Sequence, residues 1–235
     1  MRIDVSLCVA CGDCLPQCPL GVIKMDDVAV IDRDECVECG ACLRSAVCPV
    51  DAFISEAAQR PFRVGFSDPL PAKLTGIAGR GTEEMKTNDV TGRFKKGRIG
   101  IAIEPGRPGT GARFYDIEKL TIAMAELGAH FEPKNPLTML MDVKTGKIKE
   151  GILNEKVMSA VIECDFSEGK LKEAIDTLDK VAEQVDCVFS IACIGRAEAD
   201  GSVPVEKMLK KLGIPYYPNG KTNLGMGRPL AEGDM

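Results

Sequence analysis

Eleven cysteines are the residues of this 235-residue chain whose type and spacing point most directly to chemistry. Eight of them form two runs, in which cysteines stand at i, i+3 and i+6 and a Cys-Pro pair follows. The runs are Cys8, Cys11, Cys14, Cys18-Pro19 and Cys36, Cys39, Cys42, Cys48-Pro49. Three thiolates on one tight loop can hold three corners of an iron–sulfur cubane, and the fourth ligand must come from elsewhere. The pattern therefore predicts two iron–sulfur clusters.

The two runs are copies of one unit. The cysteine triplet recurs 28 positions later, and the Cys-Pro pair recurs 30 positions later. A short apolar stretch follows each Cys-Pro pair, at residues 20–23 and 50–54. We therefore expect two equivalent halves within residues 1–57.

With these residues the chain resembles the bacterial-type 2[4Fe–4S] ferredoxins, over about a quarter of its length. The resemblance implies crossed ligation, because the last cysteine of each run serves the other cluster. Cluster I would then take Cys8, Cys11, Cys14 and Cys48, and cluster II would take Cys36, Cys39, Cys42 and Cys18. One departure is the segment from Cys42 to Cys48, which is two residues longer than the ferredoxin pattern.

Two other uses of the cysteines compete with this interpretation. Structural zinc sites usually pair Cys-x2-Cys units rather than triple them. Disulfides belong to oxidising compartments, whereas no apolar signal region precedes the first cysteines and no stretch is long enough to span a membrane. We therefore expect iron–sulfur clusters in a cytoplasmic protein.

Charge is unevenly distributed along the chain. Residues 1–57 carry 4 basic and 10 acidic side chains, and residues 59–113 carry 11 basic and 5 acidic ones. The basic stretch could dock on the acidic head, bind an anionic partner, or be a solvated linker. Acidic surroundings disfavour addition of an electron, so we expect a low reduction potential. The whole chain has a net charge of −5 and no recognition motif, which argues against nucleic-acid binding.

The rest of the chain divides into a Gly/Pro-rich basic connection, residues 58–98, and a regular domain, residues 99–235. Apolar patterns predict strands at 99–104, 137–143, 159–166 and 187–194, and helices at 115–127 and 171–185. This order is the split βαβ plan. The expected fold class is α+β, a di-cluster ferredoxin domain followed by a ferredoxin-like (βαββαβ) α/β sandwich. A last helix at 205–212, a short strand at 214–217 and a Gly-rich tail complete the prediction.

A Gly-rich turn follows the first of these strands and could bind an anion. Its backbone N–H groups and two arginines could hold a phosphate, a carboxylate or a flavin phosphate. The residues are Gly106, Arg107, Gly109, Gly111 and Arg113. The turn lacks a complete P-loop or dinucleotide-binding pattern. An ordinary strand–helix turn is the alternative.

The other residues of interest have simpler explanations. Cys164, Cys187 and Cys193 lie on predicted strands, where core packing is expected and a third metal site is the alternative. His130 is the only histidine, and no catalytic partner for it is visible. The Gly-rich tail at 219–229 is either a clamp for a partner or a cofactor, or a terminal loop.

A second resemblance concerns residues 79–94, the turn at 106–111 and the tail. These stretches resemble the ferredoxin-bearing part of 6-hydroxynicotinate reductase-type proteins. The resemblance implies an iron–sulfur subunit that feeds electrons to an anaerobic reductase.

Three functions follow as hypotheses. The first is an electron-transfer protein or subunit that docks on a redox partner protein, expected to be a reductase subunit, with homo-oligomerisation possible. The second is a reductase in its own right, which uses the clusters together with a flavin or anionic substrate bound near residues 106–113. The third is a redox-responsive, ligand-binding regulator.

Overall fold

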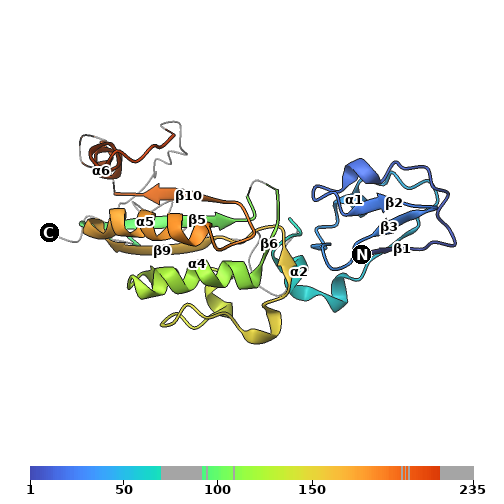
Figure 1. Ribbon diagram of the computed structural model, residues 1–235, viewed down its shortest axis with the longest axis horizontal. Coiled ribbons are helices and arrows are strands. Elements are labelled where there is room, and N and C mark those ends of the chain that lie inside the picture. The colour runs from blue at the N-terminus through green and yellow to red at the C-terminus, as the bar shows by residue number, and fades with distance from the viewer. Residues whose placement is uncertain are drawn as a thin grey trace.

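The computed structural model describes residues 1–69, 92–93, 95–107, 109–196, 198, 200 and 202–217 (Figure 1). The N-terminal region, residues 1–57, lies at one end of the molecule. An α/β region, residues 98–217, lies at the other end, and the short helix α2 lies between them.

The N-terminal region is built from four short strands and two cysteine-bearing loops. Its strands form two antiparallel pairs, β1 with β4 and β2 with β3. The elements are β1 Arg2–Ile3, η1 Leu15–Gln17, β2 Ile23–Met25, β3 Ala29–Ile31, α1 Ala41–Arg44 and β4 Phe53–Ile54. Each half contributes one strand before its cysteine run and one after it. Each pair joins one strand from each half, so the duplicated halves are interleaved.

The connection to the α/β region starts with ordered structure. It contains η2, Ala57–Gln59, and α2, Pro61–Gly65. Phe66 follows α2 and is fully buried against the ring of Phe114, with ring centroids 5.4 Å apart in an edge-to-face arrangement. Such aromatic pairs contribute about 0.5–1.5 kcal/mol beyond their buried area. The connection is therefore anchored to the first helix of the α/β region.

The α/β region contains one four-stranded antiparallel sheet in the order β10-β5-β9-β7. Along the chain the elements run β5 Arg98–Pro105, α4 Phe114–Glu126, β7 His130–Phe131, β9 Ile162–Ser167, α5 Leu171–Ala182 and β10 Phe189–Ile194. Strand, helix, strand, strand, helix, strand is the order that the apolar periodicity predicts.

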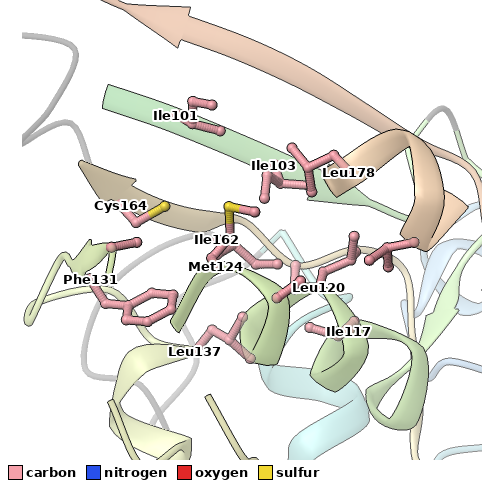
Figure 2. Packing of buried hydrophobic residues seen from close by; sticks show 14 of the residues in the cluster. Ile101, Ile103, Ile117, Leu120, Met124, Phe131, Leu137, Ile162, Cys164 and Leu178 are labelled. Atoms are coloured by element: carbon pink, nitrogen blue, oxygen red, sulfur yellow. The ribbon is translucent and has the colours of Figure 1, made fainter. Parts of the chain in front are cut away.

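The core lies between this sheet and helices α4 and α5 (Figure 2). Alternate residues of β5 and β9 face the helices, because side chains of a strand alternate between its two faces. The residues drawn from these elements include Ile101, Ile103, Ile162, Cys164, Leu120, Met124 and Leu178. Full burial of a side chain of this size contributes about 1.5–3 kcal/mol.

The remaining elements lie around this core. They are β6 Ala112–Arg113, η3 Thr138–Leu140, η4 Glu150–Ile152, β8 Lys156–Val157, η5 Glu168–Lys170 and α6 Pro204–Leu212. Strands β6 and β8 pair antiparallel and place Arg113 opposite Lys156. Within the described ranges, no helix has the length and apolar character needed to cross a membrane.

Two predicted strands are wrong. Residues 137–143 form no strand: the amide of Leu140 bonds to the carbonyl of Leu137, which gives the 3-10 turn η3. The second strand of the sheet is instead the two-residue β7. Residues 214–217 are also not a strand, because the amide of Ile214 donates to the carbonyl of Leu209 and caps α6.

Candidate metal centre

The eight N-terminal cysteines line two separate cavities, four to each. The first cavity is lined by Cys8, Cys11, Cys14 and Cys48. The second is lined by Cys36, Cys39, Cys42 and Cys18. Including space open to solvent, they measure about 360 Å³ and 370 Å³ respectively. Each cavity therefore contains three cysteines from one run and the last cysteine of the other.

The backbone around the two cavities repeats the sequence duplication. Three left-handed positions in the first half have counterparts in the second, 28 or 30 residues later. The pairs are Ala10 (φ 56°) with Glu38 (58°), Gly12 (85°) with Gly40 (70°), and Gly21 (62°) with Asp51 (48°). Left-handed backbone is uncommon for residues other than glycine. Because the same positions are left-handed in both halves, the two loops follow the same path around their cavities.

Backbone amides donate hydrogen bonds to the last cysteine of each run. The amide of Val22 lies 3.4 Å from Sγ of Cys18, and the amide of Ala52 lies 3.3 Å from Sγ of Cys48. Hydrogen bonds to cysteine sulfur stabilise negative charge and are one determinant of cluster potential. The two halves therefore provide this interaction equally.

Burial and mutual repulsion disfavour ionised thiols in these cavities. Burial, followed by the neighbouring Cys39, Cys36 and Cys18, raises the pKa of Cys42 to about 11. In the first cavity, burial and then Cys11, Cys8 and Cys48 raise the pKa of Cys14. The thiols that repel each other are those lining the same cavity. Four thiolates held this close need cations among them.

The longer loop between Cys42 and Cys48 is accommodated locally. The hydroxyl of Ser45 donates to the carbonyl of Cys42 at 2.8 Å, which continues the turn of α1. Ala46 then adopts a left-handed backbone, with φ 51°. The two extra residues are absorbed before Cys48, which still reaches the first cavity.

The donor sets fit the clusters that the sequence predicts. A [4Fe–4S] cluster takes four cysteine thiolates, and each cavity supplies four. Within the described residues, no group of three or more His, Cys, Asp or Glu side chains is close enough together to hold a single metal ion. When bound, such clusters accept and donate single electrons.

Comparison with known proteins supports this assignment. Residues 7–52 match the 4Fe-4S dicluster domain family. A ferredoxin-like protein in the vnf region of Azotobacter chroococcum mcd 1 is 46% identical over 60 residues, which cover 89% of that protein. The chain belongs to this ferredoxin family.

Other ferredoxin relatives match more or less of the chain. Ferredoxin Fdx2 of Sorangium cellulosum is 32% identical over 99 residues, covering 38% of this chain and 92% of that protein. One component of an ion-translocating oxidoreductase complex from Methanosarcina acetivorans is 41% identical over 47 residues, covering 20% of this chain and 17% of that protein. The Azotobacter relative covers 23% of this chain, so it leaves most of the α/β region unmatched.

A buried carboxylate lines the second cavity of the ferredoxin domain. Glu38 is 3% exposed, and its Oε1 lies 3.9 Å from Sγ of Cys36. The same oxygen accepts hydrogen bonds from Arg60, at 2.9 Å, and from the amino group of Met1. Its negative charge is therefore balanced at the cavity wall.

Arg63 links the second cysteine loop of the ferredoxin domain to the α/β region. Its guanidinium is 4% exposed and donates to the carbonyls of Asp34, at 2.5 Å, and Cys36, at 2.7 Å. Its Nε donates to the carboxylate of Glu155, which precedes β8. One buried cation therefore holds the backbone of a cysteine that lines the second cavity and an element of the α/β region together.

A second set of contacts joins the ferredoxin domain to β6 and β8. Arg113 donates to Asp34 and Glu35, each at 2.6 Å, and Lys156 bonds to Glu35. The hydrogen bond from Lys156 and then that from Arg113 keep the pKa of Glu35 below its usual value. Of the three roles considered for the basic stretch, docking on the acidic head is the one seen here.

Most described arginines of the basic stretch pair within the chain. Arg107 donates to Glu104 at 2.9 Å, and Arg93 and Arg98 form ion pairs with Asp165. With Arg113 also paired, the structure provides no support for an anion site at Gly106, Arg107, Gly109, Gly111 and Arg113. That site stays a prediction. The described residues do not include residues 79–91 or the tail at 219–229.

The three remaining cysteines and the histidine do not gather at one site. Cys164 is fully buried in the core, and burial raises its pKa to about 12. Cys187 and Cys193 are partly buried and pack against the same core. His130 lies opposite Asp165 in the sheet, with Nδ1 3.0 Å from Nη2 of Arg98.

Sequence reasoning missed Arg63 and Glu38. The uneven charge of residues 1–57 and 59–113 is the only sequence signal for the contacts of Arg63, and it does not identify the residue. Glu38 occupies the position of Ala10 in the second copy, so the duplication predicts where it lies in the loop. It does not predict that the carboxylate is buried at the cavity wall.

Proposed function

We propose that this chain is an iron–sulfur electron-transfer protein or subunit that delivers low-potential electrons to an anaerobic reductase in the cytoplasm. The observation that supports the proposal best is the pair of cavities, each lined by four cysteines drawn from both halves. The family match gives these cavities their cofactor class, and the single-electron chemistry of such clusters gives the role.

The proposed ligand sets follow the cavity linings. Cys8, Cys11, Cys14 and Cys48 hold cluster I, and Cys36, Cys39, Cys42 and Cys18 hold cluster II. The electrostatic coupling within each set supports this assignment, because Cys42 is repelled by Cys18 and Cys14 is repelled by Cys48.

The proposed domain organisation is a ferredoxin domain at 1–57, a basic connection at 58–98 and an α/β domain at 99–235. We assign the last to the ferredoxin-like α/β sandwich, on the strand order β10-β5-β9-β7 with two helices on one face. Its proposed role is to hold the ferredoxin domain on its cluster II side, through Arg113 and through Glu155, which accepts from Arg63 of the connection. The ferredoxin domain would then be oriented with its cluster I side toward redox partners.

Anaerobic purification of the full chain tests this function. We expect about eight irons and eight sulfides per chain, and reduction in single-electron steps. Stoichiometric zinc with little iron would overturn the proposal. About twelve irons would instead implicate Cys164, Cys187 and Cys193 as ligands.

The structure does not favour a flavin-dependent reductase. Both arginines at the predicted flavin-phosphate turn, Arg107 and Arg113, are in ion pairs with carboxylates of the same chain. Flavin absorbance in the purified protein would reopen this function.

A further inference from the structure

The two cysteine cavities of the ferredoxin domain have different surroundings. The wall of the cluster II cavity contacts the rest of the chain at several points. The carbonyl of Cys36 accepts from Arg63, and Arg44, which also bonds the carbonyl of Cys39, pairs with Asp68 at 3.1 Å. Leu20, another residue of this wall, packs near Gly111 of the α/β region. This side of the ferredoxin domain is therefore covered.

The cluster I cavity opens onto exposed surface. Cys11 is exposed, and Val9, which lines the cavity, is 59% exposed. Val5 and Leu7 lie within four residues of Val9 and are 60% and 49% exposed. Exposed apolar side chains grouped in this way mark interaction sites more often than isolated ones do. Val9 therefore joins this apolar group to the cavity, and Val5 and Leu7 lie on the segment that leads to Cys8.

Acidic side chains predominate around this apolar group, although Arg2 lies near Asp4. Asp4, Asp13 and Asp51 lie on the segments that form the cluster I cavity, and Asp13 and Asp51 are exposed. Residues 3–14 and 48–53, which supply all of the lining except Ala29, contain no lysine or arginine. Hydrogen bonds from Ser6 lower the pKa of Asp4, which is therefore ionised at neutral pH. A partner that fits here presents an apolar patch with a basic rim.

We propose that Val5, Leu7 and Val9, with the aspartates around them, form the docking surface for a one-electron carrier protein with a basic rim. This inference rests on the proposed electron-transfer function and assigns the exchange with that carrier to cluster I. Electron transfer slows steeply with distance, and the exposed Cys11 and Val9 place the cluster I cavity close to a protein docked on this face. In the exchange one electron leaves one protein and enters the other, and no atom or proton is transferred.

Mitochondrial cytochrome c is a suitable probe, because lysines surround its exposed haem edge. The measured quantity is the dissociation constant between oxidised full-length protein and oxidised cytochrome c, obtained by calorimetry. At low ionic strength, about 10 mM, screening is weak. Substituting Val5→Ser and Leu7→Ser together should raise this constant about tenfold, equivalent to about 1.4 kcal/mol. The matched control substitutes Leu43→Ser and Val188→Ser, which are 45% and 50% exposed elsewhere.

Charge variants provide an independent arm of the test. Asp13→Asn with Asp51→Asn should weaken binding severalfold at low salt and flatten its salt dependence. Asp179→Asn with Glu183→Gln, exposed on α5 and just after it, is the control and should change binding less than twofold. Iron content must match the unmodified protein in every variant. If the Val5→Ser, Leu7→Ser protein does not take up its iron, the charge variants alone test the docking surface.

Failure of docking and failure of function give different results. No binding of cytochrome c by the iron-loaded protein would overturn the docking surface, and so would equal weakening by the control variants. The proposed function survives both outcomes if the protein still exchanges electrons with a small viologen. A protein that holds no iron, or exchanges none with viologen, overturns the function and the docking surface together.

Discussion

Nη2 of Arg113 lies 2.6 Å from Oε1 of Glu35, although the two residues are 78 positions apart and belong to different regions of the chain. Glu35 directly precedes Cys36, which lines the second cysteine cavity. The pairing of β6 with β8 places Lys156 beside Arg113, so that two cations share one carboxylate. The ferredoxin domain is therefore held against the α/β region by charge next to its second cysteine loop.

Removing this charge should loosen the contact. We expect Arg113→Met with Lys156→Met to speed hydrogen exchange at residues 33–36 up to about tenfold, because partly exposed ion pairs contribute about 1 kcal/mol or less each. Mass spectrometry of exchanged peptides measures the effect. Lys172→Met with Lys210→Met, which removes two exposed helical pairs, is the control. Unchanged exchange in the first variant would show that the ion pairs do not hold the domains.

Arg63 should matter more for stability than Arg107, which is paired at the surface of the α/β region. Its guanidinium is buried, and Arg63→Met leaves two carbonyls and Glu155 without it, so we expect about 3 kcal/mol of destabilisation. Chemical denaturation gives the free energy of unfolding. Arg107→Met, whose side chain is 42% exposed in a pair with Glu104, should cost less than about 1 kcal/mol. Similar costs for the two variants would contradict the role of Arg63.

Crossed ligation predicts which cluster each end cysteine affects. Cys18→Ser should perturb the cluster at Cys36, Cys39 and Cys42, and Cys48→Ser should perturb the other. Electron paramagnetic resonance of the reduced protein can resolve the two clusters. Each variant serves as the control for the other. A Cys18→Ser effect confined to the cluster at Cys8, Cys11 and Cys14 would overturn the ligand sets.

Alanine substitutions at Gly106 and Gly109 test whether close packing explains the glycines of the predicted anion-binding turn. A Cβ at Gly106 (φ 86°) would lie 2.5 Å from the carbonyl oxygen of Met158, whereas a Cβ at Gly109 (φ 35°) meets nothing within 4 Å. We expect Gly106→Ala to destabilise the protein by about 2–4 kcal/mol and Gly109→Ala by about 1 kcal/mol. Thermal unfolding measures both. Equal, small effects would argue that close packing does not explain Gly106.

The cysteines outside the ferredoxin domain should resist alkylation. Burial raises the pKa of Cys164 to about 12 and those of Cys187 and Cys193 to about 11. At pH 8 about one thiol in a thousand is ionised at Cys187 and Cys193, and about one in ten thousand at Cys164, so iodoacetamide should label all three at least 100-fold more slowly than in urea. For Cys187 and Cys193 the rate should rise about tenfold per pH unit until the pH nears 11. Fast labelling of Cys187 in the native protein would contradict its raised pKa.

The sequence predicted the elements that local pattern determines. Helix α5 follows the apolar spacing of residues 171–185, and the eight cysteines of the ferredoxin domain were identified by spacing alone. The false strand at 137–143 has the apolar content of a strand. Its backbone bonds are satisfied locally instead, and the amide of Leu137 donates to the side chain of Asn135. Strand β7 has two residues, too few for any period to reveal.

The contacts between the regions were beyond reach of the sequence. Charge counts indicated that the acidic head and the basic stretch attract each other, but not which residues meet. The partners of Arg63 are mainly backbone carbonyls, which every residue carries and no sequence pattern marks. The sequence does not show which carboxylates pair with Arg107 and Arg113, so both arginines were assigned to a bound anion. Those that pair with Arg113 are distant from it in the sequence.

Because the two cavities exchange their end cysteines, they receive their full sets of four cysteines in a fixed order as the chain is synthesised. Cys18 is already present when Cys42 emerges, so the second cavity has its full set of thiols at that moment. The first cavity has three cysteines by residue 14 and waits for Cys48. At ribosomal speed this wait is about 2–7 s. A nascent chain therefore completes the later cavity first, and its earliest cysteines are the ones left longest without their fourth neighbour.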